Sequence, residues 1–323
     1  MTKEELLRVV RNNNSTIFEF PERGDFGSNK WRGNTSGYVI ASLIDKYKAK
    51  FLCEAFAGGG TGSDVAACMQ IDYQGFDLFP TRDNIRPLDV VNDDVPDEIS
   101  EADLVFAHPP YYNMIQYAGK MYPDPTGELK HKDMSYMTYD DFVKAMNKWL
   151  CRWFASLSGG AYFAVQVGDM RKNGVFKSML LDMVHLNVVQ IIHKKQYNTM
   201  SASRTYNSSN FYFIEHEDIV VMRKELSYIL GIEMPKKYEI DIRNSKTATW
   251  NQAIHTVMEN MDGRNKPIHL KQLYEAFDGY EKAKANQHYK EKIRQTLQMS
   301  KLYNSLGNGY WQLASRNVKL NVA

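Results

Sequence analysis

The residues best suited to chemistry lie at 104–112, where four apolar residues are followed by His108, Pro109, Pro110 and Tyr111. The apolar run predicts a buried strand, and the prolines end it because proline has no N–H to donate to a sheet. The proline carbonyls lack local partners and can accept hydrogen bonds from a ligand. Together with an aromatic face, these acceptors suit a planar ring that carries an amino group, such as adenine or cytosine. The alternative is a proline-terminated strand followed by a core tyrosine.

A glycine-rich turn lies between a predicted strand at 51–56 and a predicted helix at 63–70. Glycines let the backbone approach a ligand closely, and the N–H groups at a helix start point toward it. A second predicted strand, at 73–76, ends in Asp77, at the spacing of about 20 residues where an acid commonly binds ribose hydroxyls. No Lys-Ser or Lys-Thr follows the glycines, and the dinucleotide fingerprint is incomplete, so ATP and NAD are disfavoured. The pattern indicates another adenosine-containing cofactor; the alternative is a tight turn with a helix-capping aspartate.

The composition is that of a soluble globular protein, since 43% of the 323 residues are hydrophobic and 24% are charged. No apolar run approaches the length of a membrane span, and the first residues do not resemble a signal peptide. We therefore expect a cytoplasmic protein without membrane contact. Cys53, Cys68 and Cys151 are widely spaced in apolar surroundings, which predicts reduced core thiols. The eight histidines show no ligand spacing, so no metal site is expected.

Strands alternate with helices over residues 31–223, which predicts a Rossmann-like, doubly wound and mostly parallel α/β sheet. Residues 1–30 are expected to be an N-terminal extension with a short helix at 3–10, and 113–137 and 194–210 to be long loops. The other expected elements are helices capped by Ser36 and Thr138, strands at 162–167 and 188–192, a helix at 176–185, and a terminal antiparallel hairpin of 211–214 with 219–222.

The C-terminal residues differ in charge from the rest of the chain. From Trp250 onward there are eleven basic and six acidic residues, a net +5 that leaves −3 for the remainder. After a linker at 224–248, residues 249–323 predict three helices and a hairpin turning at 307–309, which together make a small winged-helix domain. A basic module suggests a polyanion partner; the alternative is a solvated helical surface. In a winged helix the third helix, at 287–299, would bring to a major groove Lys290, Lys292, Arg294, Gln295 and Gln298.

These motifs resemble those of the S-adenosylmethionine-dependent DNA methyltransferases that methylate exocyclic amino groups, N6 of adenine or N4 of cytosine. The glycine turn at 56–61 is similar to that family's cofactor motif, and 108–111 to its catalytic motif. The segment 31–37 is similar to the part that contacts the methionine end of the cofactor. Residues 168–171 and 216–220 also match in position. Two residues depart from the family pattern: His108 stands where Asp, Asn or Ser is usual, and Glu54 where Asp is usual.

The resemblance implies direct methyl transfer from S-adenosylmethionine to a base of double-stranded DNA, with N6 of adenine favoured over N4 of cytosine. The base would flip out of the duplex. The Pro109 carbonyl and a neutral His108 would accept the two amino hydrogens, and Tyr111, after Pro110, would stack on the base. Asp77 would hold the cofactor ribose and Asp89 its adenine. The residues expected to bind the cofactor are Asn34, Phe56, Ala57, Gly58, Gly60, Thr61, Asp77, Leu78 and Asp89.

Two other functions stay open from the sequence. One is amino-methylation of RNA, which the winged-helix pattern and the lack of a recognisable RNA module disfavour. The other is a DNA-binding regulator whose methyltransferase-like domain is catalytically silent, and His108 is the feature in its favour. The sequence predicts neither the recognition site, nor the oligomeric state, nor whether a restriction endonuclease partner exists.

Overall fold

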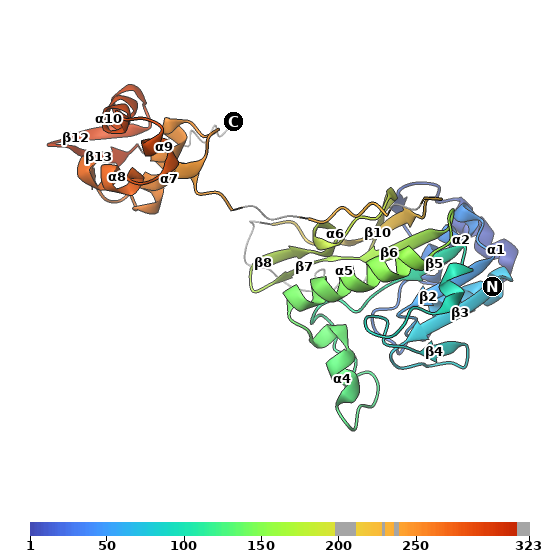
Figure 1. The fold of residues 1–323 in the computed structure, drawn as a ribbon. Helices are drawn as coiled ribbons and strands as arrows, with labels where there is room; N and C mark the ends of the chain where they lie inside the picture. Colours follow the sequence, from blue (N-terminus) through green and yellow to red (C-terminus); the bar gives the residue numbers. More distant parts are fainter. Residues whose placement is uncertain (198–210, 228–229, 236–238, 315–323) are drawn as a thin grey trace. The chain divides into compact units, whose positions relative to one another are not determined.

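The computed structural model describes residues 1–323 except 198–210, 228–229, 236–238 and 315–323. The chain divides into two compact units, Met1–Pro235 and Lys236–Ala323 (Figure 1). Among the described residues, no helix has the length and apolar character needed to cross a membrane.

An eight-stranded sheet forms the centre of unit 1, in the order β1-β9-β10-β6-β5-β2-β3-β4. Neighbouring strands from β6 to β4 pair in parallel, as do β1 and β9, whereas β10 is antiparallel to both of its neighbours. The predicted mostly parallel sheet with an antiparallel pair is confirmed. The strands are β1 (Ile17–Phe18), β2 (Phe51–Ala55), β3 (Asp72–Asp77), β4 (Ile85–Pro87), β5 (Leu104–Ala107), β6 (Tyr162–Val167), β9 (Val188–Lys195) and β10 (His216–Arg223).

Helices cover both faces of this sheet (Figure 1). On one face α1 (Lys3–Arg11), α2 (Gly37–Tyr47) and α3 (Thr61–Met69) share a core with alternate residues of the strands. On the other face lies α5 (Tyr139–Ser156), whose apolar positions recur at helical spacing and are buried. The Ser36 and Thr138 side chains accept N–H bonds at the starts of α2 and α5, as the sequence predicts.

The order of the strands reverses between β2 and β5. From β2 the chain moves outward to β3 and β4, and then returns to β5 and β6 on the other side. Ligands of open α/β sheets bind at the carboxyl ends of the strands at such a switch point. Because β2 leads into the glycine turn and β5 into His108, the topology brings the two motifs of the sequence to one place.

The prediction of a helix at 176–185 is wrong. Instead, β7 (Asp169–Lys172) and β8 (Val175–Ser178) form a separate two-stranded hairpin, followed by the short α6 (Met179–Asp182). The turn residues Asn173 and Gly174 have φ values of 51° and 78°. Two positive φ angles make a tight hairpin turn, and the β-forming residues after it continue as a strand.

Other segments also differ from expectation. The antiparallel partners of β10 are β9 and β6, and residues 211–214 form no strand. Since β9 runs to Lys195, the loop expected at 194–210 begins later, and 198–210 lie outside the described residues. The segment 113–137 contains α4 (Glu128–Lys132) and a short 3-10 helix at Met134–Tyr136. Residues 1–30 belong to unit 1, because α1 packs on α2 and β1 adds to the sheet.

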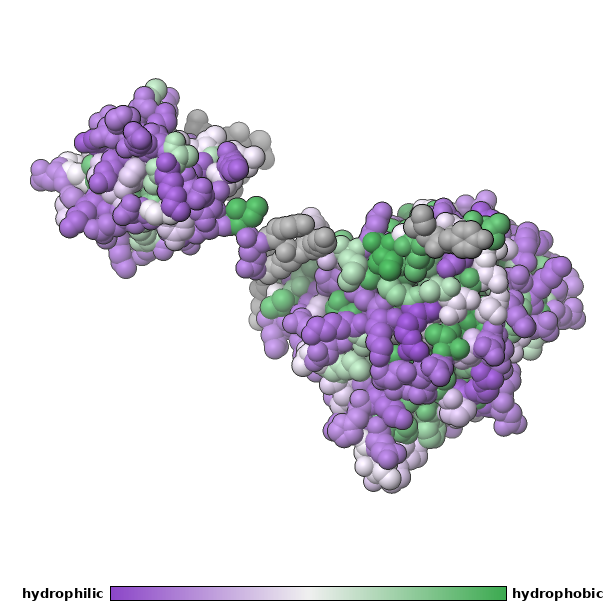
Figure 2. Space-filling view, viewed as in Figure 1, coloured by the Kyte–Doolittle hydropathy of each residue, from purple (hydrophilic) through white to green (hydrophobic). Residues whose placement is uncertain are grey.

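Unit 2 has its own core, with buried side chains from three helices and a small sheet. The sheet is antiparallel, in the order β11-β13-β12. The three longer helices and the hairpin lie where the sequence predicts them. The face seen in Figure 2 is mostly hydrophilic. The elements are a 3-10 helix at Ile242–Asn244, α7 (Trp250–Asn260), β11 (Ile268–His269), α8 (Leu270–Phe277), α9 (Glu281–Lys284), α10 (Tyr289–Met299), β12 (Tyr303–Gly307) and β13 (Tyr310–Leu313).

Candidate active site

A pocket lies at the switch point of the sheet, and residues of both sequence motifs line it. Gly60, Pro109 and Tyr111 were predicted as site residues but are not among the residues that line this pocket. The predicted residues that do line it are Asn34, Phe56, Ala57, Gly58, Thr61, Asp77, Leu78, Asp89, His108 and Pro110.

The glycine turn brings backbone close to this pocket. Phe56 and Gly58 have positive φ angles of 57° and 47°, and Gly60 caps α3 with φ at 78°. A Cβ atom on Gly58 would lie 2.6 Å from the indole nitrogen of Trp31, so a larger residue has no room there. The Oγ1 atom of Thr61 is buried and has no hydrogen-bond partner among the described residues. An unpartnered hydroxyl at the start of a helix, beside bare glycine backbone, is suited to a ligand.

Two buried carboxylates, Asp77 and Asp89, line the same pocket. Asp77 accepts hydrogen bonds from the N–H groups of Gly58 (2.8 Å) and Phe79 (2.9 Å). Burial raises the pKa of Asp77 to about 6, although these two bonds oppose the shift. Asp89 accepts a bond from the N–H of Val91 at 3.1 Å. Each carboxylate is oriented by backbone groups and keeps lone pairs for the hydroxyl or amino hydrogens of a ligand.

Glu54, the fourth residue of β2, is buried beneath the glycine turn. It accepts a hydrogen bond from the hydroxyl of Tyr73 at 2.7 Å and packs against Gly62 of α3. Burial raises the pKa of Glu54 to about 8, so this carboxyl is largely protonated at neutral pH.

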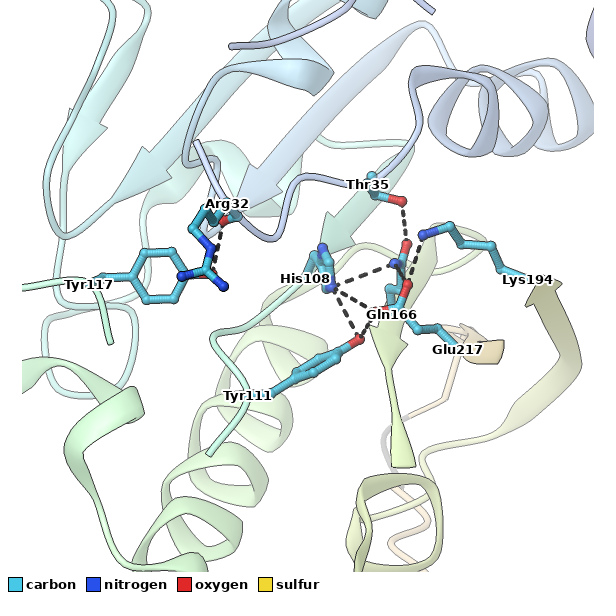
Figure 3. A network of polar contacts seen from close by, with 8 residues as sticks. All are labelled: Arg32, Thr35, His108, Tyr111, Tyr117, Gln166, Lys194 and Glu217. Atoms are coloured by element: carbon cyan, nitrogen blue, oxygen red, sulfur yellow. Dashed lines mark hydrogen bonds and ion pairs between the residues drawn. The ribbon is translucent and has the colours of Figure 1, made fainter. Parts of the chain in front are cut away.

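A buried polar network holds His108 at the end of β5 (Figure 3). The Tyr111 hydroxyl lies 2.8 Å from Oε1 of Glu217 and 3.1 Å from Nε2 of His108. The amide nitrogen of Gln166 and the Nζ atom of Lys194 each lie 2.7 Å from Oε2 of Glu217. The network therefore links the catalytic motif to β6, β9 and β10.

The directions of these bonds follow from the charge of Glu217. Burial alone would raise its pKa, but Lys194 and His108 hold the pKa well below the ordinary value. Glu217 is therefore a carboxylate and can only accept, so Tyr111 donates its hydroxyl hydrogen to it. The phenolic oxygen then accepts the Nε2–H of His108. It follows that Nε2 is the nitrogen of His108 that donates a hydrogen in this network.

An aromatic cluster adjoins the pocket and includes two residues of the segment 113–137. The ring of Trp31 stacks with Tyr117 (centroids 5.8 Å apart) and with Tyr122 (6.0 Å). Tyr122 in turn stacks on Phe79 at 4.6 Å. Tyr117 also donates a hydrogen bond to the backbone carbonyl of Arg32 at 3.2 Å (Figure 3). Burial raises the pKa of both tyrosines above the ordinary value, so they offer neutral stacking surfaces.

Sequence reasoning gave no individual role to Glu217, Gln166 or Lys194, and Trp31 entered only as part of the segment 31–37. The one signal for Glu217 is an acidic residue at the start of an apolar strand. Its partner Lys194 is fixed by strand register, because Glu217 and Lys194 face each other across β9 and β10. No local pattern of the sequence encodes that pairing.

Strand pairing also brings together His193, His216 and Asp218, which the spacing of the histidines did not predict. Their potential ligand atoms lie within 4.8 Å of one another, so these three side chains could hold a metal ion. In the structure, Nδ1 of His193 lies 2.6 Å from Oδ1 of Asp218.

The five side chains predicted to contact DNA lie on α10. Four of them are exposed and Lys292 is half-buried, while Ile293 and Leu297 of the same helix face the core of unit 2. Arg294 pairs with Glu291 at 2.7 Å, and Lys292 donates to the Gln295 side chain at 2.9 Å. The exposed residues of the set are Lys290, Arg294, Gln295 and Gln298.

Comparison with known protein families adds the deciding observation. The model of the N6/N4 DNA methylases matches residues 102–305, which is well over half of the chain. This chain belongs to the DNA methylase family. S-adenosyl-L-methionine is therefore the cofactor of this methylase, as the glycine turn and Asp77 suggested. No characterised sequence was found to match the chain.

Several solved structures show a partial likeness to this methylase. Human N-acetylserotonin methyltransferase in complex with SAM is 14% identical over 58% of this methylase and 51% of its own chain, with a TM-score of 0.30. The methylase thus spans about half the length of that chain. Protein 1320 of Thermoplasma acidophilum is 10% identical over 70% of this methylase and 100% of its own chain, with a TM-score of 0.36. The N-methyltransferase NodS from Bradyrhizobium japonicum is 11% identical over 58% and 94% (TM-score 0.34). At these scores the likenesses bear on neither substrate nor partner.

The residues of the pocket fit the cofactor of this methylase. Thr61 contributes an unpartnered buried hydroxyl, and Asp77 and Asp89 contribute acceptors suited to hydroxyl and amino groups. Apolar side chains, among them Phe56 and Leu78, line the rest. An adenosine moiety requires this mixture of apolar walls and a few oriented polar groups.

Proposed function

We propose that this methylase transfers a methyl group to N6 of an adenine flipped out of a specific sequence of double-stranded DNA. The observation that supports it best is the pocket at the switch point, which joins the glycine turn to His108. A cofactor site and an amino-group acceptor in one cavity are what direct transfer to an exocyclic amine requires.

In this proposal the glycine turn and its neighbours bind the cofactor. Asp77 accepts bonds from the ribose hydroxyls and Asp89 from the adenine amino group, while Gly58 and Gly60 leave the backbone bare. Bound S-adenosylmethionine supplies an electrophilic methyl group. The other residues assigned to the cofactor are Asn34, Phe56, Ala57, Thr61 and Leu78.

His108 and Pro109 make the target nitrogen nucleophilic. An amino group conjugated to its ring is a poor nucleophile, and acceptors on its two hydrogens free the lone pair. The Pro109 carbonyl accepts one hydrogen, and Nδ1 of His108 accepts the other. Nδ1 suits this role because Nε2–H is engaged by the Tyr111 hydroxyl, and Nδ1 makes no hydrogen bond to any described residue. Protonation of His108 would remove the acceptor.

Tyr111 is assigned a second role, stacking on the flipped base beside Pro110. Stacking returns roughly 1–3 kcal/mol per base, which offsets the few kcal/mol that flipping costs. In Tyr111→Ala, productive base binding should weaken while affinity for the cofactor stays near wild type. Loss of cofactor binding in that variant would contradict the assignment.

Unit 2 is assigned to DNA as a winged helix. Three helices followed by a hairpin, with β11 completing a small antiparallel sheet, support that assignment. The third of these helices, α10, would lie in the major groove, where Lys290, Lys292 and Arg294 meet phosphates. The side chains of Gln295 and Gln298 would then face base edges.

The test is methyl transfer from labelled S-adenosylmethionine to mixed-sequence duplex DNA, followed by nucleoside analysis. N6-methyladenine is the expected product. If the product is N4-methylcytosine, the proposed mechanism stands and the target base is cytosine. Absence of label in DNA, with the cofactor still bound, would contradict the proposal and redirect the search to RNA first and to a silent DNA-binding regulator second.

A further inference from the structure

A small hairpin extends beside the catalytic motif. Its strands β7 and β8 form a two-stranded sheet of their own, which Figure 1 shows beyond the end of the central sheet. The hairpin follows β6 directly, so its root lies at the carboxyl edge of the sheet, where the pocket is found.

The inner side of the hairpin is fixed to the catalytic motif and to α5. Gly168, just before β7, packs so closely on Tyr111 that a Cβ atom would lie 3.0 Å from the ring. The Nζ atom of Lys172 lies 5.5 Å from the ring centroid of Tyr112, and that of Lys177 lies 3.8 Å from the centroid of Tyr139. These contacts hold the hairpin next to the place assigned to the target base.

The outer side combines cationic and apolar side chains. Arg171 is paired with Phe176 across the hairpin, and its guanidinium lies 5.5 Å from the Phe176 ring and 4.6 Å from the Phe211 ring. Phe176 is 45% exposed, and Val175, which pairs with Lys172, is 56% exposed. An exposed aromatic ring is apolar and is hydrated poorly. Beside exposed cations it forms a surface suited to nucleic acid, because cations bind phosphates and aromatic rings stack on bases.

The three cations of the hairpin lie over aromatic rings, as Lys130 does elsewhere in unit 1. Within the described residues, none of Arg171, Lys172 and Lys177 forms an ion pair with a carboxylate. By contrast, Lys194 and Lys195 pair with carboxylates. Cations that are not neutralised by a carboxylate can meet phosphates without first breaking an ion pair.

We propose that this hairpin lies against double-stranded DNA beside the target base. Arg171, Lys172 and Lys177 contact phosphates, and Phe176 inserts against the neighbouring base step. Apolar side chains such as Phe commonly act as wedges that unstack a step, which lowers the cost of flipping the next base. The inference rests on the proposed function, since it takes the same duplex as substrate.

The test measures binding of the full-length methylase to a mixed-sequence duplex at several salt concentrations. Each of Arg171→Ala, Lys172→Ala and Lys177→Ala should lower the slope of log K against log salt by about 0.9, as expected for one lost phosphate contact. Phe176→Ser should weaken binding about tenfold with the slope unchanged, and Phe176→Leu should retain binding because it keeps an apolar wedge. The matched control is Lys144→Ala, on the exposed side of α5 and paired with Asp141, which should match wild type.

Wild-type affinity and slope in the three alanine variants and in Phe176→Ser would overturn the inference, and would restrict DNA contact to other parts of the chain. Unchanged cofactor affinity shows that a variant is folded. A different result would contradict the proposed function. In that case the wild type would bind duplex DNA but transfer no methyl group to it.

Discussion

The hydroxyl of Tyr111 lies 2.8 Å from Oε1 of Glu217, although the two residues are 106 positions apart. Because Glu217 is a carboxylate, this contact orients the hydroxyl and leaves its oxygen free to accept the Nε2–H of His108. One buried acid thereby decides which nitrogen of the imidazole carries the lone pair. In the proposed mechanism, this allows His108 to accept an amino hydrogen at the position where the resembling motif usually has Asp, Asn or Ser.

Glu217→Gln tests this relation directly. The new amide oxygen should turn toward Lys194, and its NH2 group toward Tyr111, so the hydroxyl would donate to His108 instead. The lone pair would move to Nε2, and kcat should fall about tenfold to a hundredfold, the effect of losing one strong hydrogen bond. The cofactor Kd should stay within about twofold of wild type, because the Asp77 side of the pocket is untouched.

Tyr111→Phe should lower kcat in the same way, since it removes the oxygen between His108 and Glu217. The 15N chemical shifts of the His108 ring provide a readout independent of activity and should show the proton leaving Nε2 in Glu217→Gln. A wild-type kcat in both variants would show that the contact is only structural.

The pH dependence of kcat should report the protonation of His108. As pH is lowered from about 8 to about 5.5, kcat should decrease, because a protonated imidazole has no lone pair with which to accept a hydrogen bond. His108→Asn keeps an acceptor oxygen that does not titrate, so its kcat should be flat over this range. If kcat of His108→Asn still depends on pH, the pH dependence arises from another group.

Asp77 should affect a different kinetic constant over part of the same range. Burial raises its pKa to about 6, so below that pH the carboxylate becomes protonated and loses its charge. The KM for S-adenosylmethionine should therefore rise below about pH 6, in wild type and in His108→Asn alike. The two titrations separate because one acts on kcat and the other on cofactor binding.

Local sequence predicted the two motifs and their meeting point, but not the network around them. The apolar run before Pro109 and the glycines before Thr61 fix their own strand ends and turns, and alternating strands and helices then imply the switch point. Glu217 reaches His108 only because β10 pairs with β6 and β6 pairs with β5, and residues far apart in the chain determine these pairings. The hairpin at 169–178 was missed because Phe176, Met179, Leu180 and Met183 also recur at helical spacing, whereas the Asn173-Gly174 turn decides the structure.

Glu54 should make the stability of the protein depend on pH. Its pKa is raised by burial to about 8 in the folded state, against about 4.3 for an unfolded chain. Between these values the folded state binds the extra proton, so stability should fall as pH rises through this window and level off above about 8. Glu54→Gln resembles the protonated form and should remove this dependence. Its Tm should already exceed that of wild type at pH 6, and the difference should be larger at pH 9.

The control for Glu54→Gln is Glu101→Gln, an exposed site at which the Tm difference from wild type should not change with pH. Thermal unfolding of the three proteins across pH 6 to 9 decides the matter. Equal pH slopes for wild type and Glu54→Gln would mean that Glu54 is ionised in the folded state.

The side chains of α10 should divide into those that give affinity and those that give sequence preference. Lys290 lies over the rings of Tyr274 and Tyr289, and it and Lys292 are proposed to meet phosphates. Lys290→Ala and Lys292→Ala should each reduce the salt slope of duplex binding by about 0.9, equally for all sequences. Gln295→Ala and Gln298→Ala should leave that slope unchanged and instead broaden the set of methylated sites.

Lys271→Ala, on α8 and facing Glu275, is the matched control and should bind as wild type. If the glutamine variants methylate the same sites as wild type, α10 does not read the bases, and sequence preference comes from another part of the chain.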